Sequence, residues 1–173
     1  MTRASEDRIL VLLRHAKAEQ VSGKPDHERE LTARGRRDAE AAGRWLTEHG
    51  IGCDLVLCST SARTLQTSQG IAGNCAEAEV WEDRRIYAGG ADQLLEVVRE
   101  ADPAASIVLM IGHAPGIPAL ASLLADGEGS VQAHRLMAEG FPTCGLAVLR
   151  YSGHWSDLGY DDARLDFFAV PRG

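Results

Sequence analysis

The chain has 173 residues, of which 45% are hydrophobic and 25% charged, a composition typical of globular proteins and not of disordered ones. Its 18 Lys and Arg against 25 Asp and Glu give a formal net charge of −7, which disfavours general binding to nucleic acid or to an anionic membrane. Apolar runs reach about five residues where a membrane span needs about 20, and the polar start does not resemble a signal peptide. We therefore expect one cytoplasmic domain over residues 1–173, with no membrane and no nucleic-acid partner.

Short apolar segments alternate with amphipathic ones along the chain. The predicted elements are a strand at 9–13, a loop at 14–31, a helix at 32–49, a strand at 54–58, a helix from the hydroxyl residues 59–61 to about 71, a weaker strand at 78–81, a helix at 91–98, a strand at 106–111, a helix at 115–124, a turn at 127–129, and strands at 146–151 and 165–170. Strands that are apolar at every position are typical of a parallel sheet covered on both faces. The alternation predicts an α/β fold, a three-layer α/β/α sandwich around a mainly parallel mixed sheet.

The cysteines show no pattern of a metal or redox site. The four of them, Cys53, Cys58, Cys75 and Cys144, form no C-x-x-C pair. Because cytoplasmic thiols are kept reduced, we expect all four to be free.

Three of the predicted strands end in groups that suit an anion. Arg14 and His15 follow the first strand, Arg63 lies on the helix after the second, and His113 follows the third. Ligands of open α/β sheets bind outside the carboxyl ends of the strands, so these side chains can meet at one edge, next to a helix N-terminus. Two guanidiniums and two imidazoles suit a phosphate dianion, and a neutral imidazole can act as a nucleophile.

Each of these residues also has an ordinary structural interpretation. Arg14 could be a surface residue and His15 could cap a strand end. Arg63 could be a solvated helix residue, and His113 could cap the following helix. Spacing alone leaves both interpretations open, and the coincidence of four such residues favours a phosphate site.

The motifs resemble those of a known family, the histidine phosphatase superfamily with its phosphoglycerate mutase-like fold. Residues 12–16 (Leu-Leu-Arg-His-Ala) resemble its Arg-His-Gly signature, and residues 58–67 resemble its second motif, a Ser followed by Arg-x-x-Gln-Thr. Residues 111–116 are similar to its Gly-His-Asn/Ala-Pro-Gly motif, and residues 30–35 to its Pro-Leu-Thr-x-x-Gly segment. The end of the chain, from residue 141, is similar to that of the short SixA-like branch.

The resemblance implies roles for the matching residues. His15 would be the nucleophile that takes the phosphoryl group, while Arg14, Arg63 and a protonated His113 would hold its oxygens. The reaction would be hydrolysis through a phosphohistidine, with no cofactor and no metal. The second nitrogen of His15 would be held by a backbone carbonyl, which fixes its tautomer. Family analogy alone also brings Lys17 and Thr143 to the substrate.

The sequence departs from the family at two places. Ala16 stands where most members have Gly, as in the SixA-like branch. Many members also have a Glu that protonates the leaving group, which we would place here at Ala88 or Gly89, so we expect the dedicated acid to be absent. Glu82 and Asp83 are then either a solvated acidic turn or the acid itself. An imidazole leaving group can depart already protonated, so a missing acid favours a protein phosphohistidine substrate.

Alternatives to a protein phosphohistidine phosphatase stay open. One is a small-molecule phosphomonoester phosphatase of the same superfamily, and another is a weakly active phosphate-binding regulatory module. A zinc hydrolase built on His15, His113 and cysteines is disfavoured because the ligand spacing is wrong. The partner would be a phosphorylated protein or a small phosphorylated substrate. His27, His134 and His154 have no assigned role, and we expect them at the surface.

Overall fold

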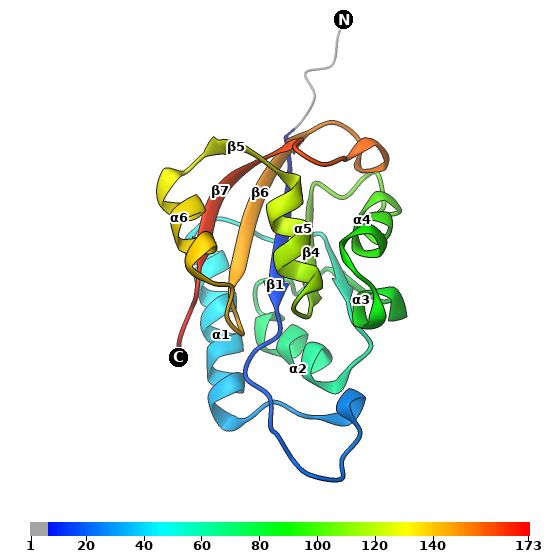
Figure 1. The fold of residues 1–173 in the computed structure, drawn as a ribbon, viewed down its shortest axis with the longest axis vertical. Coiled ribbons are helices and arrows are strands. Elements are labelled where there is room, and N and C mark those ends of the chain that lie inside the picture. The colour runs from blue at the N-terminus through cyan, green and yellow to red at the C-terminus, as the bar shows by residue number, and fades with distance from the viewer. Residues whose placement is uncertain (1–6) are drawn as a thin grey trace, which may run out of the picture.

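The computed structural model describes residues 7–173, and its centre is one seven-stranded sheet of order β3-β2-β4-β1-β6-β7-β5 (Figure 1). The strands are β1 (Asp7–Arg14), β2 (Leu55–Cys58), β3 (Glu79–Glu82), β4 (Ile107–Gly112), β5 (Ala125–Gly129), β6 (Leu146–Ser152) and β7 (Ala163–Ala169). β1 pairs in parallel with β4, β4 with β2, β2 with β3, and β5 with β7. Only β6 runs antiparallel to its neighbours β1 and β7, so the sheet is mixed and mainly parallel as predicted.

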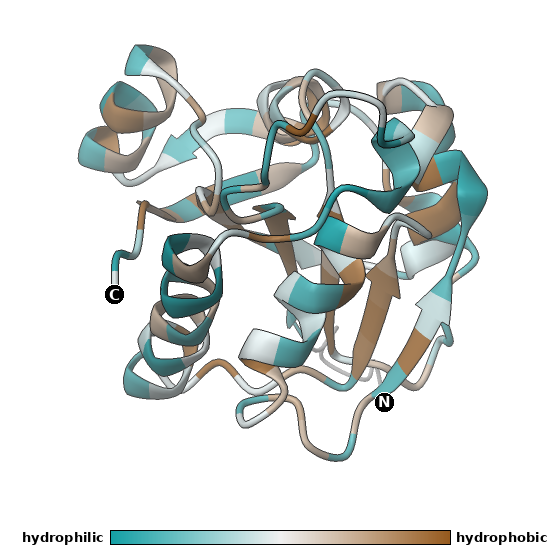
Figure 2. Cartoon of the chain, turned by 90° about the horizontal axis from the view of Figure 1, so that it is seen from below, coloured by the Kyte–Doolittle hydropathy of each residue, from teal (hydrophilic) through white to brown (hydrophobic). Residues whose placement is uncertain are grey.

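Helices cover both faces of the sheet. The helices are α1 (Ala33–Glu48), α2 (Ala62–Ile71), α3 (Arg84–Ala88), α4 (Ala91–Arg99), α5 (Gly116–Leu124) and α6 (Val131–Glu139), with short 3₁₀ turns η1 (Asp26–Glu28) and η2 (Trp155–Asp157). Alternate residues of β1 point to opposite faces. Leu10 and Leu12 join the core under α3 to α6, whereas Val11 and Leu13 join the core under α1 and α2. The predicted three-layer sandwich is confirmed, and Figure 2 shows the apolar strands between the helical layers.

Local caps fix where the helices near the strand ends begin. The hydroxyl of Thr32 accepts a hydrogen bond from the backbone N–H of Gly35 at 3.0 Å, which starts α1 where the sequence predicted. A side chain at Gly35 would collide with the carbonyl oxygen of Lys17, so α1 packs directly on the loop that follows β1. The hydroxyl of Ser61 caps α2 in the same way, through the N–H of Thr64.

Three elements differ from the sequence-based expectations. The glycine-rich segment expected to be only a turn belongs to β5, which pairs irregularly with β7 at the sheet edge. The short helices α3 and α6 were not predicted. Glu82 ends β3 and Asp83 caps α3, so these two residues do not form an acidic turn. The apolar residues Ala133, Leu136 and Met137 of α6 recur at helical spacing, but only Ala133 is buried and Val131 is 74% exposed, so this short helix has little contact with the core.

The expectation of four free thiols is wrong for one pair. Cys53, before β2, and Cys75, after α2, form a disulfide with their Cα atoms 5.1 Å apart. They are 22 residues apart, and no local spacing rule connects them. Cys58 and Cys144 are free and buried.

No helix within residues 7–173 has the length and apolar character needed to cross a membrane.

Candidate active site

Three neighbouring parallel strands, β2, β4 and β1, end at one edge of the sheet. The backbone N–H of His15 donates to the carbonyl of Gly112 at 3.0 Å, and that of Ser59 donates to Ile111 at 3.0 Å. These two bonds keep the residues that directly follow β1 and β2 beside the end of β4. The loop between β1 and α1 lies at this edge beside α2, at the bottom of Figure 1.

His15 lies in this edge as a buried, neutral imidazole, with 7% of its surface exposed. Its Nδ1 lies 2.7 Å from the carbonyl oxygen of Ala16. A carbonyl only accepts, so Nδ1 carries the proton and Nε2 keeps a free lone pair. The pKa of His15 is lowered to about 4, chiefly by burial and further by the positive charges of Arg63 and Arg14, against the opposing effect of the Ala16 bond. The imidazole is therefore a ready nucleophile at neutral pH.

A hydroxyl ties the turn at His15 to α2. Thr67 accepts from the backbone N–H of Ala16 at 3.1 Å and donates to the carbonyl of Arg63 at 2.7 Å. Thr67 lies in the second motif, but no role for it was predicted from the sequence.

Two guanidiniums flank the imidazole with unused donors. Arg63 is 5% exposed, and its Nη1 donates to the carbonyl of Asp26 at 2.8 Å. Arg14 donates through Nη1 to the carbonyl of Phe141 at 2.9 Å. Among the residues that the structure describes, the buried Nε of each arginine has no acceptor. Buried polar groups are nearly always paired, so these two N–H groups fit the oxygens of a bound anion.

His113 completes the group of four predicted side chains. Its ring lies 5.3 Å from that of His15, and its Nδ1 accepts from Nη2 of Arg63 at 3.3 Å. Its Nε2 therefore carries the proton, which it donates to the hydroxyl of Ser59 at 2.7 Å. Burial, followed by the charge of Arg63, lowers the pKa of His113 to about 3. Without a bound anion the ring is therefore neutral, because it is buried against a cation. Its protonation against a bound phosphate stays a prediction.

A carboxylate that the sequence analysis missed forms the rim of the site. Asp26, in η1, accepts from Nη2 of Arg63 at 3.1 Å and from the hydroxyl of Tyr87 at 2.7 Å. Arg29 donates to its other oxygen at 3.0 Å. The Tyr87 hydrogen bond and the two guanidiniums hold the pKa of Asp26 well below its usual range. No motif or periodicity links residues 61 positions apart, so only the fold reveals this contact.

One of the three unassigned histidines belongs to the same rim. The ring of His27 meets that of Tyr87 edge to face at 4.7 Å, and Tyr87 in turn lies 5.4 Å from His113. His134 instead donates to the carbonyl of Glu128 near β5, and His154 lies before η2.

The two acidic residues before α3 have local positions that do not involve the site. Asp83 caps α3 by accepting from the N–H of Arg85 at 2.8 Å, and it forms an ion pair with the same side chain at 2.7 Å. Glu82 is exposed at the end of β3. Within residues 7–173 the hydrogen bonds and ion pair of the Asp83 side chain all go to Arg85, and none joins Asp83 or Glu82 to His15. The absence of a dedicated acid stays a prediction. The substrate contacts of Lys17 and Thr143 stay predictions.

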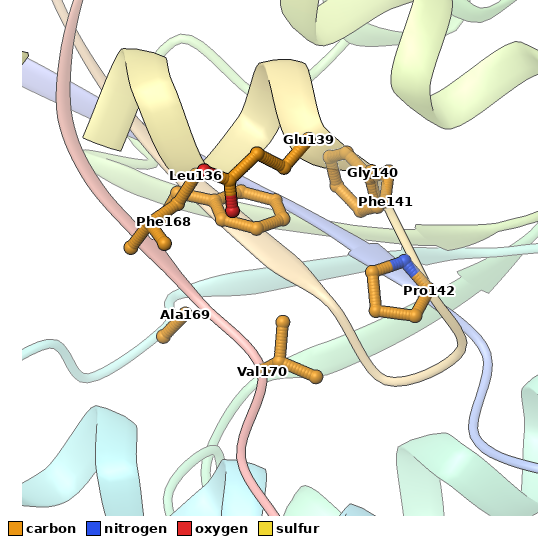
Figure 3. Close-up of a pocket in the computed structure, with 8 residues that line it drawn as sticks. All are labelled: Leu136, Glu139, Gly140, Phe141, Pro142, Phe168, Ala169 and Val170. Carbon is orange, nitrogen blue, oxygen red and sulfur yellow. The ribbon is translucent and has the colours of Figure 1, made fainter. Parts of the chain in front are cut away.

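An apolar groove of about 620 Å³ adjoins the Arg14 side of the site (Figure 3). It lies between the end of α6 and the end of β7, and its lining comprises Leu136, Glu139, Gly140, Phe141, Pro142, Phe168, Ala169 and Val170. Phe141 supplies both a wall of the groove and the carbonyl that holds Arg14. The groove and the site are therefore linked through Phe141.

No group of three or more His, Cys, Asp and Glu side chains within residues 7–173 is placed to hold a metal ion. His15 and His113 lie close together, but the two free cysteines, Cys58 and Cys144, are buried. That the reaction needs no metal stays a prediction.

Comparisons with known proteins point to one family. A model of the histidine phosphatase superfamily (branch 1) matches residues 10–87. An uncharacterised protein of Mycobacterium tuberculosis is 38% identical over 162 residues, which cover 92% of this chain and 100% of that protein. A structure from Nakamurella multipartitia, named as a candidate phosphohistidine phosphatase SixA, is 38% identical with a TM-score of 0.86 and covers 98% of this chain and 99% of its own. A similarly named structure from Agrobacterium tumefaciens is 28% identical with a TM-score of 0.76, covering 95% and 99%.

Proposed function

This chain belongs to the histidine phosphatase superfamily, in its SixA-like branch, and on that premise we propose that it hydrolyses a phosphorylated substrate through a phosphohistidine on His15. The observation that carries the proposal is the state of His15. Its Nδ1 is held by the Ala16 carbonyl and its Nε2 is free, beside two arginines whose buried Nε groups lack acceptors. A nucleophile and a site for the group it attacks thus lie side by side.

The proposed reaction has two steps, and in each the protein supplies position and charge. Nε2 of His15 attacks phosphorus in line, the bond from phosphorus to the leaving atom breaks, and that atom keeps the electron pair. Water then attacks the phosphohistidine, which releases inorganic phosphate and restores the neutral imidazole. Arg14 and Arg63 offset the charge that develops on the phosphoryl oxygens, so the proposed reaction needs no metal and no cofactor.

His113 would change its partners during this reaction. A phosphate dianion beside it would draw Nη2 of Arg63 toward its oxygens and would raise the pKa of the imidazole above the low value of the ligand-free site. Nδ1 could then take up a proton and donate to phosphate, while Nε2 keeps its bond to Ser59.

A protein phosphohistidine is the substrate we propose. Asp83 is engaged as a helix cap, which leaves an alkoxide leaving group without an evident proton donor, whereas a protonated imidazole needs none. The apolar groove beside Arg14 supports a substrate that extends beyond the phosphoryl group. A small-molecule phosphomonoester remains the second candidate, since the same four residues would hold its phosphate. The cytoplasmic location and the phosphorylated protein partner are part of this proposal.

Trapping the intermediate tests the proposal directly. We expect quenching with alkaline detergent during turnover of a ³²P-labelled phosphohistidine protein to yield a label on His15 that survives in alkali and is lost in acid, with activity unaffected by EDTA. His15→Ala should abolish the label and lower the turnover rate about 10⁴-fold or more. His134→Ala, which removes a half-buried imidazole on α6 that contacts the carbonyl of Glu128, is the matched control and should keep both.

Several outcomes would contradict the proposal. A label on another residue would overturn the role of His15. Faster turnover of metabolite phosphates than of phosphohistidine would favour the small-molecule phosphatase. Phosphate binding by an inactive wild-type chain would favour a regulatory module.

A further inference from the structure

The rim of the site carries an ionised carboxylate that phosphoryl transfer itself does not require. The Asp26 side chain is 55% exposed, in contrast to the 6% exposed side chain of Arg63 with which it pairs. Its two oxygens accept from Arg63, Tyr87 and Arg29. Three donors therefore hold the group in one place and keep it negative, with an open face toward solvent.

Asp26 borders the site through two of its donors. It accepts from Arg63, which belongs to the site, and from Tyr87, whose ring lies 5.4 Å from that of His113. In in-line attack the leaving atom lies opposite the attacking nitrogen, so it points away from the buried His15. We infer that this direction is outward, so that a group attached to the leaving atom comes close to the exposed carboxylate of Asp26.

A role for Asp26 in holding phosphate or in donating a proton is disfavoured by its charge. A carboxylate repels the phosphoryl oxygens, and Arg63 and Arg29 only partly offset that repulsion. The pKa of Asp26 lies well below its usual range, so at neutral pH the group has no proton to give a leaving group. A fixed negative charge at this place can still act on the charge of the leaving group.

We propose that Asp26 selects substrates by the charge of the leaving group, favouring one that carries a protonated nitrogen and disfavouring one that carries a carboxylate or a second phosphate. The inference rests on the phosphatase reaction at His15 proposed above, and it extends that proposal to the leaving side of the substrate. A phosphohistidine leaves as a cationic or neutral imidazole, whereas many phosphorylated metabolites carry a further anion. Specificity would thus come partly from repulsion of the wrong substrate.

Aryl phosphates with differently charged para substituents test this selection. The series is 4-(trimethylammonio)phenyl phosphate, a neutral 4-acetylphenyl phosphate and 4-carboxyphenyl phosphate, each measured as kcat/KM with wild type and with Asp26→Asn. For each ester we take the ratio of kcat/KM in Asp26→Asn to kcat/KM in wild type, so the intrinsic reactivity of the ester cancels. We expect the preference for the cationic over the anionic ester to fall about tenfold in Asp26→Asn, which corresponds to about 1.4 kcal/mol. The neutral ester should change by less than about threefold, and added salt should weaken the wild-type preference.

Asp7→Asn provides a matched control at the other end of β1, an eight-residue strand. Asp7 also accepts from a hydroxyl, that of Ser152 at 2.6 Å, and also pairs with an arginine, Arg150 at 3.7 Å. Its removal changes the net charge by the same amount, so we expect the preference among the esters to stay at the wild-type value.

Two results would overturn the inference. One is a cationic-to-anionic preference that Asp26→Asn leaves unchanged. The other is an equal loss for all three esters, which would make Asp26 only a positioning residue for Arg63. Because the esters contain no phosphohistidine, a wild-type enzyme that shows the charge preference but ignores phosphohistidine would refute the proposed substrate and leave the inference standing.

Discussion

The floor and the rim of the site are built in different ways. The floor, made of Arg14, His15, Arg63 and His113, is carried by the ends of β1 and β4 and by the first turn of α2. The rim, made of Asp26, His27 and Tyr87, is carried by η1 and by the five-residue α3. Floor residues are positioned by the strand ends and by α2, whereas rim residues are held mainly by side-chain contacts, among them those of Asp26 with Arg63 and Tyr87. The difference suggests that the fold sets the chemistry and that the rim adjusts which substrates reach it.

Replacing the floor arginine Arg63 should have the largest effect. Arg63→Lys keeps the charge but loses the planar fork that binds Asp26 and faces the phosphate site, so we expect kcat/KM for an aryl phosphate to fall about 10²- to 10³-fold. Steady-state kinetics check this. Arg44→Lys, on the exposed face of α1, is the control and should behave as wild type. A loss below tenfold would show that the floor depends on charge alone.

The burial of the floor should also be visible as a lowered pKa of His15. We expect the His15 imidazole to titrate with a pKa of about 4, well below its ordinary value of 6.5, because burial and the neighbouring arginines oppose its charge. Following the imidazole signals by NMR from pH 3 to pH 8 measures this directly, and His15→Gln identifies the signal. A midpoint near 6.5 would mean that the imidazole is solvated and not part of a buried floor.

The same displacement links stability to pH. Between about pH 6.5 and pH 4 the unfolded chain binds a proton at His15 that the folded chain does not. The free energy of unfolding should therefore fall as the pH drops through that range, and the contribution of His15 should level off below it. The free energy of unfolding, measured by urea denaturation of wild type and His15→Gln at pH 7 and pH 5, isolates the contribution of His15. The contribution of His113 is present in both proteins and extends to lower pH, because its pKa is lower.

A change at the rim should have the smallest effect. Tyr87→Phe removes the hydroxyl that donates to Asp26 and keeps the ring against His27 and His113, so we expect kcat/KM to change about two- to tenfold. Tyr160→Phe, which removes a hydroxyl that donates to Asp92, is the matched control. A loss as large as that of Arg63→Lys would show that the rim takes part in the chemistry and would end the distinction between rim and floor.

The sequence predicts the floor better than the rim for a physical reason. Buried parallel strands are visible as apolar runs, and a residue directly after such a run must lie at the sheet edge, as Arg14 and His113 do. The contact between Asp26 and Tyr87 depends instead on where a loop and a short helix come to rest. The disulfide between Cys53 and Cys75 depends in the same way on packing between segments distant in the chain.

The hydroxyl of Thr67 has a consequence for how the site moves. This one oxygen bonds both to the backbone beside the attacking imidazole and to the turn of α2 that carries Arg63. A shift of α2 along the sheet would therefore pull the imidazole with it, so that the spacing between nucleophile and guanidinium is preserved during thermal motion. Two segments distant along the chain thus behave as one mechanical unit.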